Sequence, residues 1–231
     1  MNQNLTSRTA VLVFALSAEA EATQKAISKA DALFDVLTDH TLETVEKTGL
    51  PHFHFTEAEQ TGTTFGERFT NAIRAVYEKG YSQVITIGND SPQLKAYHIL
   101  EAKKQLENKR FVLGPSLDGG FYLMGLHQEQ FEPFEFQQLA WQTSRLGKQL
   151  VQLISDAVPV FYLPTLIDID SAADVNALIS SNFQIPRRIL KILCSILFEP
   201  QKILGQVAIL PNSISLRIPQ NRGSPFLLQS E

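Results

Sequence analysis

The sequence predicts an α/β fold in which helices cover the faces of a largely parallel sheet. Short apolar runs alternate with longer stretches of helical periodicity, the pattern that such sheets produce. Apolar residues make up 44% of the chain and charged residues 19%, a composition typical of globular proteins. The 231 residues are enough for one main domain with a self-sufficient core.

Five apolar runs have the length of strands and separate the helical stretches. They are Val11–Ala15, His52–Phe55, Val84–Ile87, Phe111–Leu113 and Val158–Leu163. A further apolar strand follows the turn Asp118-Gly119-Gly120 and continues to Leu126. The adjacent glycines of this turn allow positive φ and close approach of a ligand. On local grounds the turn is equally well an Asp-Gly hairpin turn or a binding loop.

The firmest helix begins after Thr64. Thr64 and Glu67 have the spacing of a capping box, in which each side chain satisfies a free backbone donor at a helix start. Apolar residues then recur three and four positions apart and end before Gly80. The spacing predicts a helix from Phe65 to Gly80 with one buried face.

Asp90 closes the third predicted strand. The following Ser91 and Pro92 are typical of an N-cap and a first helical position, so a helix is expected from there towards Asn108. Open α/β sheets bind ligands outside the carboxyl ends of their strands, which places Asp90 where chemistry would occur. The alternative is an ordinary turn aspartate beside a helix start.

Charge and cysteine content exclude several classes of protein. The net charge of −4 does not favour binding to a polynucleotide. The single cysteine, Cys194, cannot form an intramolecular disulfide, and the apolar run after Arg8 is too short for a signal peptide, so we expect a cytoplasmic protein. No stretch approaches the ~20 consecutive apolar residues of a transmembrane helix. The motifs of P-loop proteins and of α/β-hydrolases are missing.

Residues 184–231 differ from residues 10–183, which we take as the main α/β domain. This extension holds six basic and two acidic residues. We expect a helix over Arg187–Phe198 and strands over Val207–Leu210 and Ile214–Ile218. The extension either touches an anionic membrane surface or lipid acceptor, or docks on the main domain or at a subunit interface of a homodimer.

Eight motifs in order resemble a bacterial family of glycosyltransferase-like proteins with the nucleotide-diphospho-sugar transferase (GT-A) fold. The family was long catalogued as a domain of unknown function, and some members are called selenodomain-associated transferases. It is distantly related to guanylyltransferases for the molybdenum cofactor and phospholactate. The motifs are Gln60–Gly62, Phe65–Phe69, Asn71-Ala72, Gly88–Pro92, Leu113–Pro115, Asp118–Leu123, Trp141–Ser144 and Asp168–Asp174. The resemblance implies a three-layer α/β/α fold with a mostly parallel mixed sheet.

The resemblance also implies a site for a nucleotide-sugar or nucleoside triphosphate, with Mg²⁺ or Mn²⁺ to neutralise the phosphates. We expect Asp90 and Asp118 to be catalytic and Asp90 and Asp168 to hold the cation. Asp118, Asp168 and Asp170 all stay open as catalytic base. The expected substrate-binding residues are Ala15, Ser17, Lys25, Arg68, Asn89, Gly119, Gly120 and Trp141. Arg68 suits a phosphate because its planar group donates paired hydrogen bonds.

The segment after the first strand departs from the family pattern. Family members typically have a glycine-containing Lys-Thr-Arg-Leu segment, whereas here residues 14–25 hold no glycine, and Glu19 and Glu21 would repel a phosphate if they pointed into the site. This favours glycosyl transfer from a nucleotide-diphospho-sugar over its first alternative, nucleotidyl transfer to a small phosphorylated acceptor. The second alternative is a non-catalytic nucleotide- or sugar-binding protein of the same fold.

Overall fold

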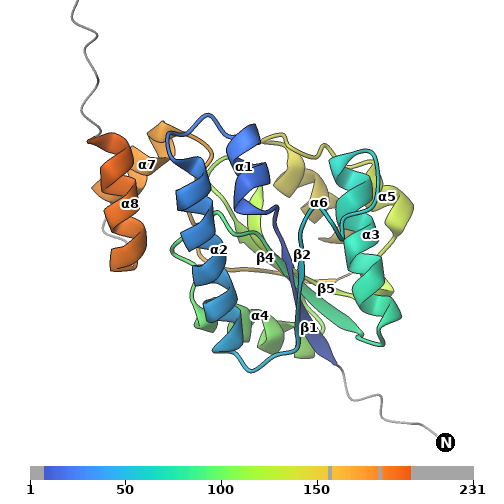
Figure 1. The fold of residues 1–231 in the computed structure, drawn as a ribbon. Helices are drawn as coiled ribbons and strands as arrows, with labels where there is room; N and C mark the ends of the chain where they lie inside the picture. The colour runs from blue at the N-terminus through green and yellow to red at the C-terminus, as the bar shows by residue number, and fades with distance from the viewer. Residues whose placement is uncertain (1–7, 156–157, 182–183, 199–231) are drawn as a thin grey trace, which may run out of the picture. The chain divides into compact units, whose positions relative to one another are not determined.

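The computed structural model describes residues 8–155, 158–181 and 184–198. A sheet forms the centre of this part (Figure 1). It has six strands in the order β2-β1-β3-β5-β4-β6. The strands are β1 (Thr9–Phe14), β2 (His52–Phe55), β3 (Gln83–Ile87), β4 (Phe111–Pro115), β5 (Phe121–His127) and β6 (Val160–Tyr162). All neighbours are parallel except β5, which is antiparallel to β3 and β4. The predicted mostly parallel mixed sheet is confirmed.

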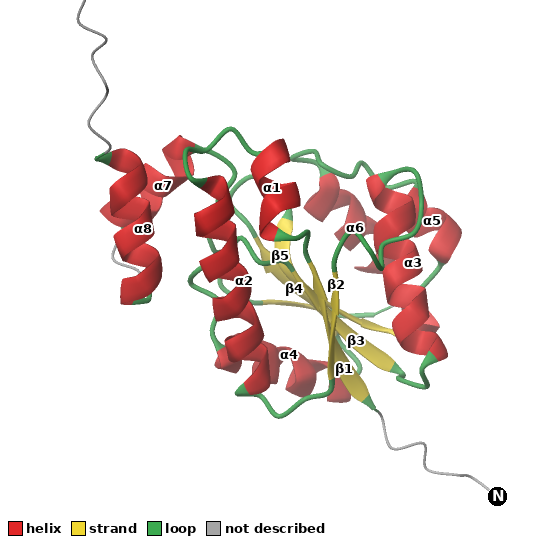
Figure 2. Cartoon of the chain, in the orientation of Figure 1, coloured by secondary structure: helices red, strands yellow, loops and turns green. Residues whose placement is uncertain are grey.

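Helices cover both faces of the sheet (Figure 2). On one face lie α2 (Ala30–Glu46) and α4 (Ala96–Glu107); on the other lie α3 (Phe65–Glu78), α5 (Pro133–Gln137) and α6 (Leu146–Ser155). A short helix, α1 (Ala18–Gln24), follows β1, and a 3₁₀ turn, η1 (Gln128–Gln130), follows β5. The three-layer α/β/α architecture is therefore as the sequence predicts.

Alternation along β1 shows how one strand serves both layers. Ala10 and Leu12 belong to the apolar cluster shared with α3, whereas Val11 and Val13 belong to the cluster shared with α4. All four are fully buried. Successive side chains of a strand point to opposite faces, so a continuous apolar run is what a strand covered on both sides requires.

The predicted capping box at the start of α3 is present. The Glu67 N–H donates to Thr64 Oγ1 at 3.1 Å, and the Thr64 N–H donates to Glu67 Oε2 at 3.2 Å. The helix ends at Glu78, and Gly80 follows with a φ of +86°. In the first turn a Cβ on Gly66 would lie 2.6 Å from the Trp141 ring, so this glycine lets the tryptophan pack against the helix.

The predicted start of α4 is wrong. The helix begins at Ala96, and residues 91–94 form a buried turn closed by the Leu94 N–H donating to the Ser91 carbonyl at 3.0 Å. The N-cap is Lys95, whose N–H donates to Nδ1 of His98 at 3.0 Å. Burial of Leu94, which is 2% exposed, outweighs the local preference of a Ser-Pro pair for a helix start.

Two further helices pack beside α2. These are α7 (Ala172–Ser180) and α8 (Arg187–Leu197), and apolar residues of all three form a separate cluster with Ile167 and Ile169. Arg188 of α8 pairs with Glu43 of α2 at 2.7 Å. The helix expected after residue 184 is thus present, while the expected strands at 207–210 and 214–218 lie outside the described residues. The domain boundary at residue 184 stays a proposal. Among the described helices, none is long and apolar enough to cross a membrane.

Candidate functional site

A cavity of about 370 Å³ lies at the carboxyl edge of the parallel strands. Its wall includes Ala15 after β1, Asn89 and Asp90 after β3, Ser116 after β4 and Asp168 after β6. Because parallel strands end at the same edge of a sheet, their following loops converge there. The cavity thus collects residues from four separate segments of the chain.

The turn between β4 and β5 presents Asp118 to this cavity. Asp118 Oδ1 accepts hydrogen bonds from Ser116 Oγ at 2.5 Å and from the Gly120 N–H at 2.8 Å. Gly119 has a φ of +94°, and a Cβ there would collide with the carbonyl oxygen of Ser144. Only glycine fits this position, and the hydrogen bonds from Ser116 and Gly120 fix the orientation of the Asp118 carboxylate.

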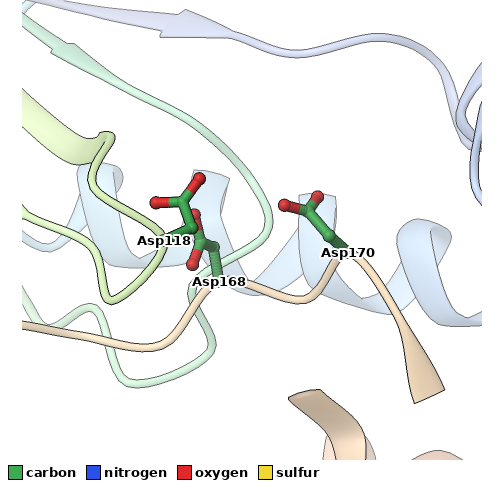
Figure 3. Close-up of side chains that lie close together, drawn as sticks. All are labelled: Asp118, Asp168 and Asp170. Atoms are coloured by element: carbon green, nitrogen blue, oxygen red, sulfur yellow. The ribbon is translucent and has the colours of Figure 1, made fainter. Parts of the chain in front are cut away.

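Three carboxylates meet at this turn. Asp118, Asp168 and Asp170 each offer one oxygen, and these oxygens all lie within 4.8 Å of one another (Figure 3). Hard divalent cations bind carboxylate oxygens at about 2.0 to 2.6 Å, so oxygens at this separation can surround one ion. The donor set therefore fits Mg²⁺ or Mn²⁺. Asp90, expected as a ligand, does not belong to this group.

The cavity is strongly acidic. Glu21, Asp90 and the three clustered aspartates line it, against the two cations Lys25 and Arg68. Burial, followed by the charges of Asp90, Asp118 and Asp170, raises the pKa of Asp168 to about 7. Burial likewise raises the pKa of Asp90. A bound cation would relieve this mutual repulsion.

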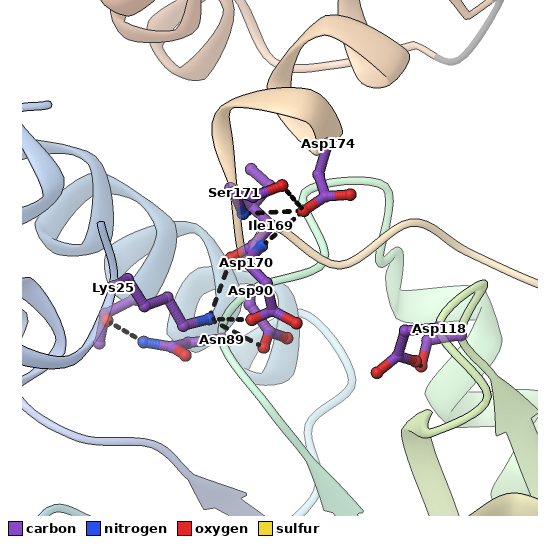
Figure 4. Close-up of polar contacts among 10 residues, drawn as sticks. Lys25, Asn89, Asp90, Asp118, Ile169, Asp170, Ser171 and Asp174 are labelled. Carbon is purple, nitrogen blue, oxygen red and sulfur yellow. Dashed lines mark hydrogen bonds and ion pairs between the residues drawn. The ribbon is translucent and has the colours of Figure 1, made fainter. Parts of the chain in front are cut away.

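Lys25 is engaged with acidic groups inside the cavity. Its Nζ lies 2.7 Å from Asp170 Oδ1 and 3.5 Å from Asp90 Oδ2, and it donates to the carbonyl of Ile169 at 2.9 Å (Figure 4). Burial opposes its charge, but Asp90 and Asp170 outweigh burial and raise the pKa of the ammonium group. Lys25, expected as a substrate-binding residue, is thus already paired.

Arg68 differs from Lys25 in this respect. It lines the cavity from the first turn of α3 and makes no side-chain hydrogen bond or ion pair with any residue that the structure describes. Beside it, Phe65, Phe69 and Phe121 surround Trp141 with ring centroids 4.9 to 6.3 Å apart. The Trp141 indole N–H donates to the Phe136 carbonyl at 2.7 Å, which fixes the ring in this aromatic wall.

The remaining expected residues are divided. Ala15 and Gly120 line the cavity, as does Asn89, which donates to Thr38 Oγ1 at 2.9 Å. Ser17 does not line it; Ser17 is the N-cap of α1, and its hydroxyl and N–H donate to Glu57. Gly119 lines a neighbouring shallow hollow instead.

Sequence reasoning did not assign Glu21 or Tyr122 to the site, and considered Asp170 only as a base. Glu21 lies four residues before Lys25, the C-cap of α1, whose N–H donates to the Glu21 carbonyl. Asp170 follows Asp168 by two positions, so an extended segment would turn both to one side. Tyr122 gave no such indication; it lines the cavity and donates to the Pro164 carbonyl at 3.0 Å.

Comparisons with known proteins identify the family and the fold of this chain. A family model described as "uncharacterized protein conserved in bacteria (DUF2064)" matches residues 21–143. A crystal structure from Desulfovibrio desulfuricans, described as a "putative nucleotide-diphospho-sugar transferase", aligns with a TM-score of 0.71 and 21% identity, covering 84% of this chain and 98% of that one. The 4-diphosphocytidyl-2C-methyl-D-erythritol synthase of Anaerococcus prevotii aligns with a TM-score of 0.50 and 10% identity, covering 76% and 100%. A search of curated proteins found no significant match. The structural matches show the fold shared with these transferases.

Proposed function

This chain belongs to the bacterial DUF2064 family and has the nucleotide-diphospho-sugar transferase fold, and from this premise we propose that it is a cation-dependent glycosyltransferase. It would transfer a glycosyl group from a nucleotide-diphospho-sugar to an acceptor. The observation that carries the proposal is the group of Asp118, Asp168 and Asp170 inside the cavity at the carboxyl edge of the sheet. Such a group can hold the cation that a diphosphate requires in acidic surroundings.

Charge supports this assignment. Five carboxyl groups against two cations would oppose the entry of a nucleoside diphosphate, and further positive charge would offset this repulsion. A divalent ion at the three aspartates would supply that charge and neutralise the diphosphate as the glycosyl bond breaks. The lowered repulsion would also favour the ionised form of Asp168.

The chain's own residues would orient the donor. No side chain among the described residues pairs with the Arg68 guanidinium group, which would donate paired hydrogen bonds to a phosphate at the helix start. Trp141 and its aromatic neighbours form an apolar wall that excludes water and offers a flat surface to a sugar or base. The Ser116 hydroxyl and the Gly120 N–H both donate to Asp118 Oδ1, which would leave Oδ2 for a cation or the donor.

Nucleotidyl transfer from a triphosphate is less well supported. The segment after β1 forms α1, whose first turn is acidic, and Ser17 is occupied by Glu57. Lys25, the cation of this segment, is paired with Asp90 and Asp170. Nothing in residues 14–25 therefore adds free positive charge for a third phosphate.

A ligand screen tests the proposal. Nucleotide-sugars and nucleoside triphosphates are compared by thermal shift, each with and without Mn²⁺, on wild type, Asp168→Asn and the surface control Asp39→Asn. A ligand at a hundred times its Kd stabilises the folded state by about 2.7 kcal/mol. We expect a Mn²⁺-dependent shift with a nucleotide-sugar that Asp168→Asn loses and Asp39→Asn keeps, followed by release of the nucleoside diphosphate when acceptors are added.

The other outcomes decide between the alternatives. A shift with triphosphates alone, with pyrophosphate released on turnover, would replace the proposal with nucleotidyl transfer. A nucleotide-sugar shift without turnover would support a binding protein. No shift with any ligand on folded protein would reject donor binding at ordinary affinities.

A further inference from the structure

Lys25 occupies a position that resembles a coordinated cation. Its Nζ contacts two carboxylate oxygens and one carbonyl oxygen, from Asp90, Asp170 and Ile169, at 3.5, 2.7 and 2.9 Å (Figure 4). Carboxylate and backbone carbonyl oxygens are also the ligands of hard divalent cations. An ammonium group therefore stands where these oxygens could hold a metal ion.

The ammonium group is fixed rather than free in solvent. The Lys25 side chain is 15% exposed, and Nζ lies 4.7 Å from the centroid of the Phe34 ring. The backbone N–H of Lys25 donates to the Glu21 carbonyl at 3.0 Å, which ties it to the end of α1. On the opposite side, the Ile169 N–H donates to the Asp90 carbonyl at 3.0 Å, so the two acidic segments are also joined to each other.

This position needs a positive charge. Asp90 and Asp170 face it, and the carboxyl group of Glu21, a residue only 8% exposed, interacts with the same ammonium group. Removing one partner from such a group leaves uncompensated buried charge, which is more costly than losing the attraction alone. If the Lys25 ammonium group is removed, a cation from solution would take its place between these carboxylates.

We infer that the Lys25 ammonium group fills a second cation position, formed by Asp90, Asp170 and the Ile169 carbonyl, beside the position proposed for the divalent ion. The inference rests on the proposed function for the first ion and goes beyond it. Paired-metal sites hold two ions about 3.5 to 4 Å apart, commonly with shared ligands. Here Asp170 is the shared ligand, because it belongs to the three-aspartate group and also pairs with Lys25. Lys25 is thus a positioning residue that limits the site to one divalent ion.

Counting bound Mn²⁺ tests the inference. Equilibrium dialysis and the electron paramagnetic resonance of free Mn²⁺ give the number of ions per folded chain for wild type, Lys25→Ala and Lys25→Arg. Lys25→Ala should bind one ion more than wild type, because alanine vacates the position. Lys25→Arg, which keeps the charge, should bind the same number as wild type. Adding Asp90→Asn to Lys25→Ala should remove the gained ion, whereas adding Asp39→Asn should not.

The inference is decided by the difference in bound Mn²⁺ ions between Lys25→Ala and wild type, whatever number wild type itself binds. Equal numbers in the two proteins would overturn it, even if wild type binds one ion as proposed. No ion in wild type and one in Lys25→Ala would reject the proposed first cation and leave the inference standing. If Lys25→Ala does not fold alone, Mn²⁺ added during refolding should restore a cooperative thermal transition; failure to do so, with wild type refolding normally, would also overturn it.

Discussion

The carboxylates of Asp118 and Asp168 offer oxygens within 4.8 Å of each other, although one lies between β4 and β5 and the other follows β6. The pairing of the strands brings these two aspartates close together. β4 pairs in parallel with β6, and the bridge between Ser116 and Leu166 continues that pairing past the strand ends. Two loops that leave neighbouring parallel strands are thereby carried to the same place.

Replacing Asp168 should stabilise the cation-free protein. Burial, followed by the charges of Asp90, Asp118 and Asp170, raises the pKa of Asp168 from 3.8 to about 7. The unfolded chain therefore loses this proton first, and the free energy of unfolding falls as pH rises from 3.8 through 7. The full shift corresponds to roughly 4 kcal/mol, and solvent screening in the open cavity reduces it. We expect Asp168→Asn to gain about 2 kcal/mol in urea unfolding at pH 8 with a chelator present.

The same substitution should lose the stabilisation that Mn²⁺ gives to wild type, since the ligand group is then incomplete. Asp39→Asn, an exposed change on α2, should alter neither quantity. An Asp168→Asn protein that is less stable than wild type without cation, or equally stabilised by Mn²⁺, would contradict the description of an acidic cation site.

Removing the Arg68 guanidinium should affect ligand binding more than stability. Arg68 has no side-chain partner among the described residues, so Arg68→Gln should change the free energy of unfolding by no more than about 0.5 kcal/mol. A lost charge-assisted hydrogen bond to phosphate should weaken Mn²⁺-pyrophosphate binding by about tenfold or more. Isothermal titration calorimetry measures this, with Arg74→Gln on the exposed side of α3 as control. If both variants lose the same affinity, the overall charge of the protein, and not a contact made by Arg68, would account for the effect.

Gly119 and Gly49 allow the cost of backbone strain to be separated from that of a collision. Both have positive φ, +94° and +68°, but a Cβ at Gly49 meets nothing within 4 Å whereas one at Gly119 collides with Ser144. Gly49→Ala should cost about 1 kcal/mol in urea unfolding. Gly119→Ala should cost roughly 3 kcal/mol and also weaken Mn²⁺ binding, because the turn that holds Asp118 must move. If the two substitutions lower the free energy of unfolding by similar amounts, the backbone at Ser144 can move away from the new Cβ without an energetic penalty.

The fold was predictable where local chemistry decides it. The Thr64 and Glu67 capping box needs only residues three positions apart, and the apolar run of β1 reports burial on both faces. The start of α4 was not predictable, because the burial of Leu94 depends on neighbours that are distant in sequence. Local preference at Ser91 and Pro92 then gave the wrong boundary.

The sequence indicated part of the cavity wall but not the contacts within it. Arg68 stands out because it lies at a helix start, whereas Asp118 and Asp168 were indicated by the motifs that resemble the family; all three line the cavity. The pairing of Lys25 with Asp170 joins segments that only the packing of α1 beside the 168–170 loop brings together. Which carboxylates gather around a cation, and which are held by a lysine, therefore requires the three-dimensional arrangement.

His98 should make the folded protein less stable in mild acid. Its Nδ1 accepts from the Lys95 N–H, and burial, then Lys95, lowers its pKa from 6.5 to about 4. The unfolded chain therefore binds a proton more readily below pH 6.5, and stability falls as pH drops from there towards 4. Between pH 7.5 and pH 5 this loss should be about 2 kcal/mol. His98→Gln keeps an acceptor at the same helix position without titrating, so urea unfolding at the two pH values should show a loss smaller by about that amount, while the other histidines contribute equally to both proteins. An identical pH dependence in wild type and His98→Gln would mean that His98 is protonated in the folded state as readily as in the unfolded chain.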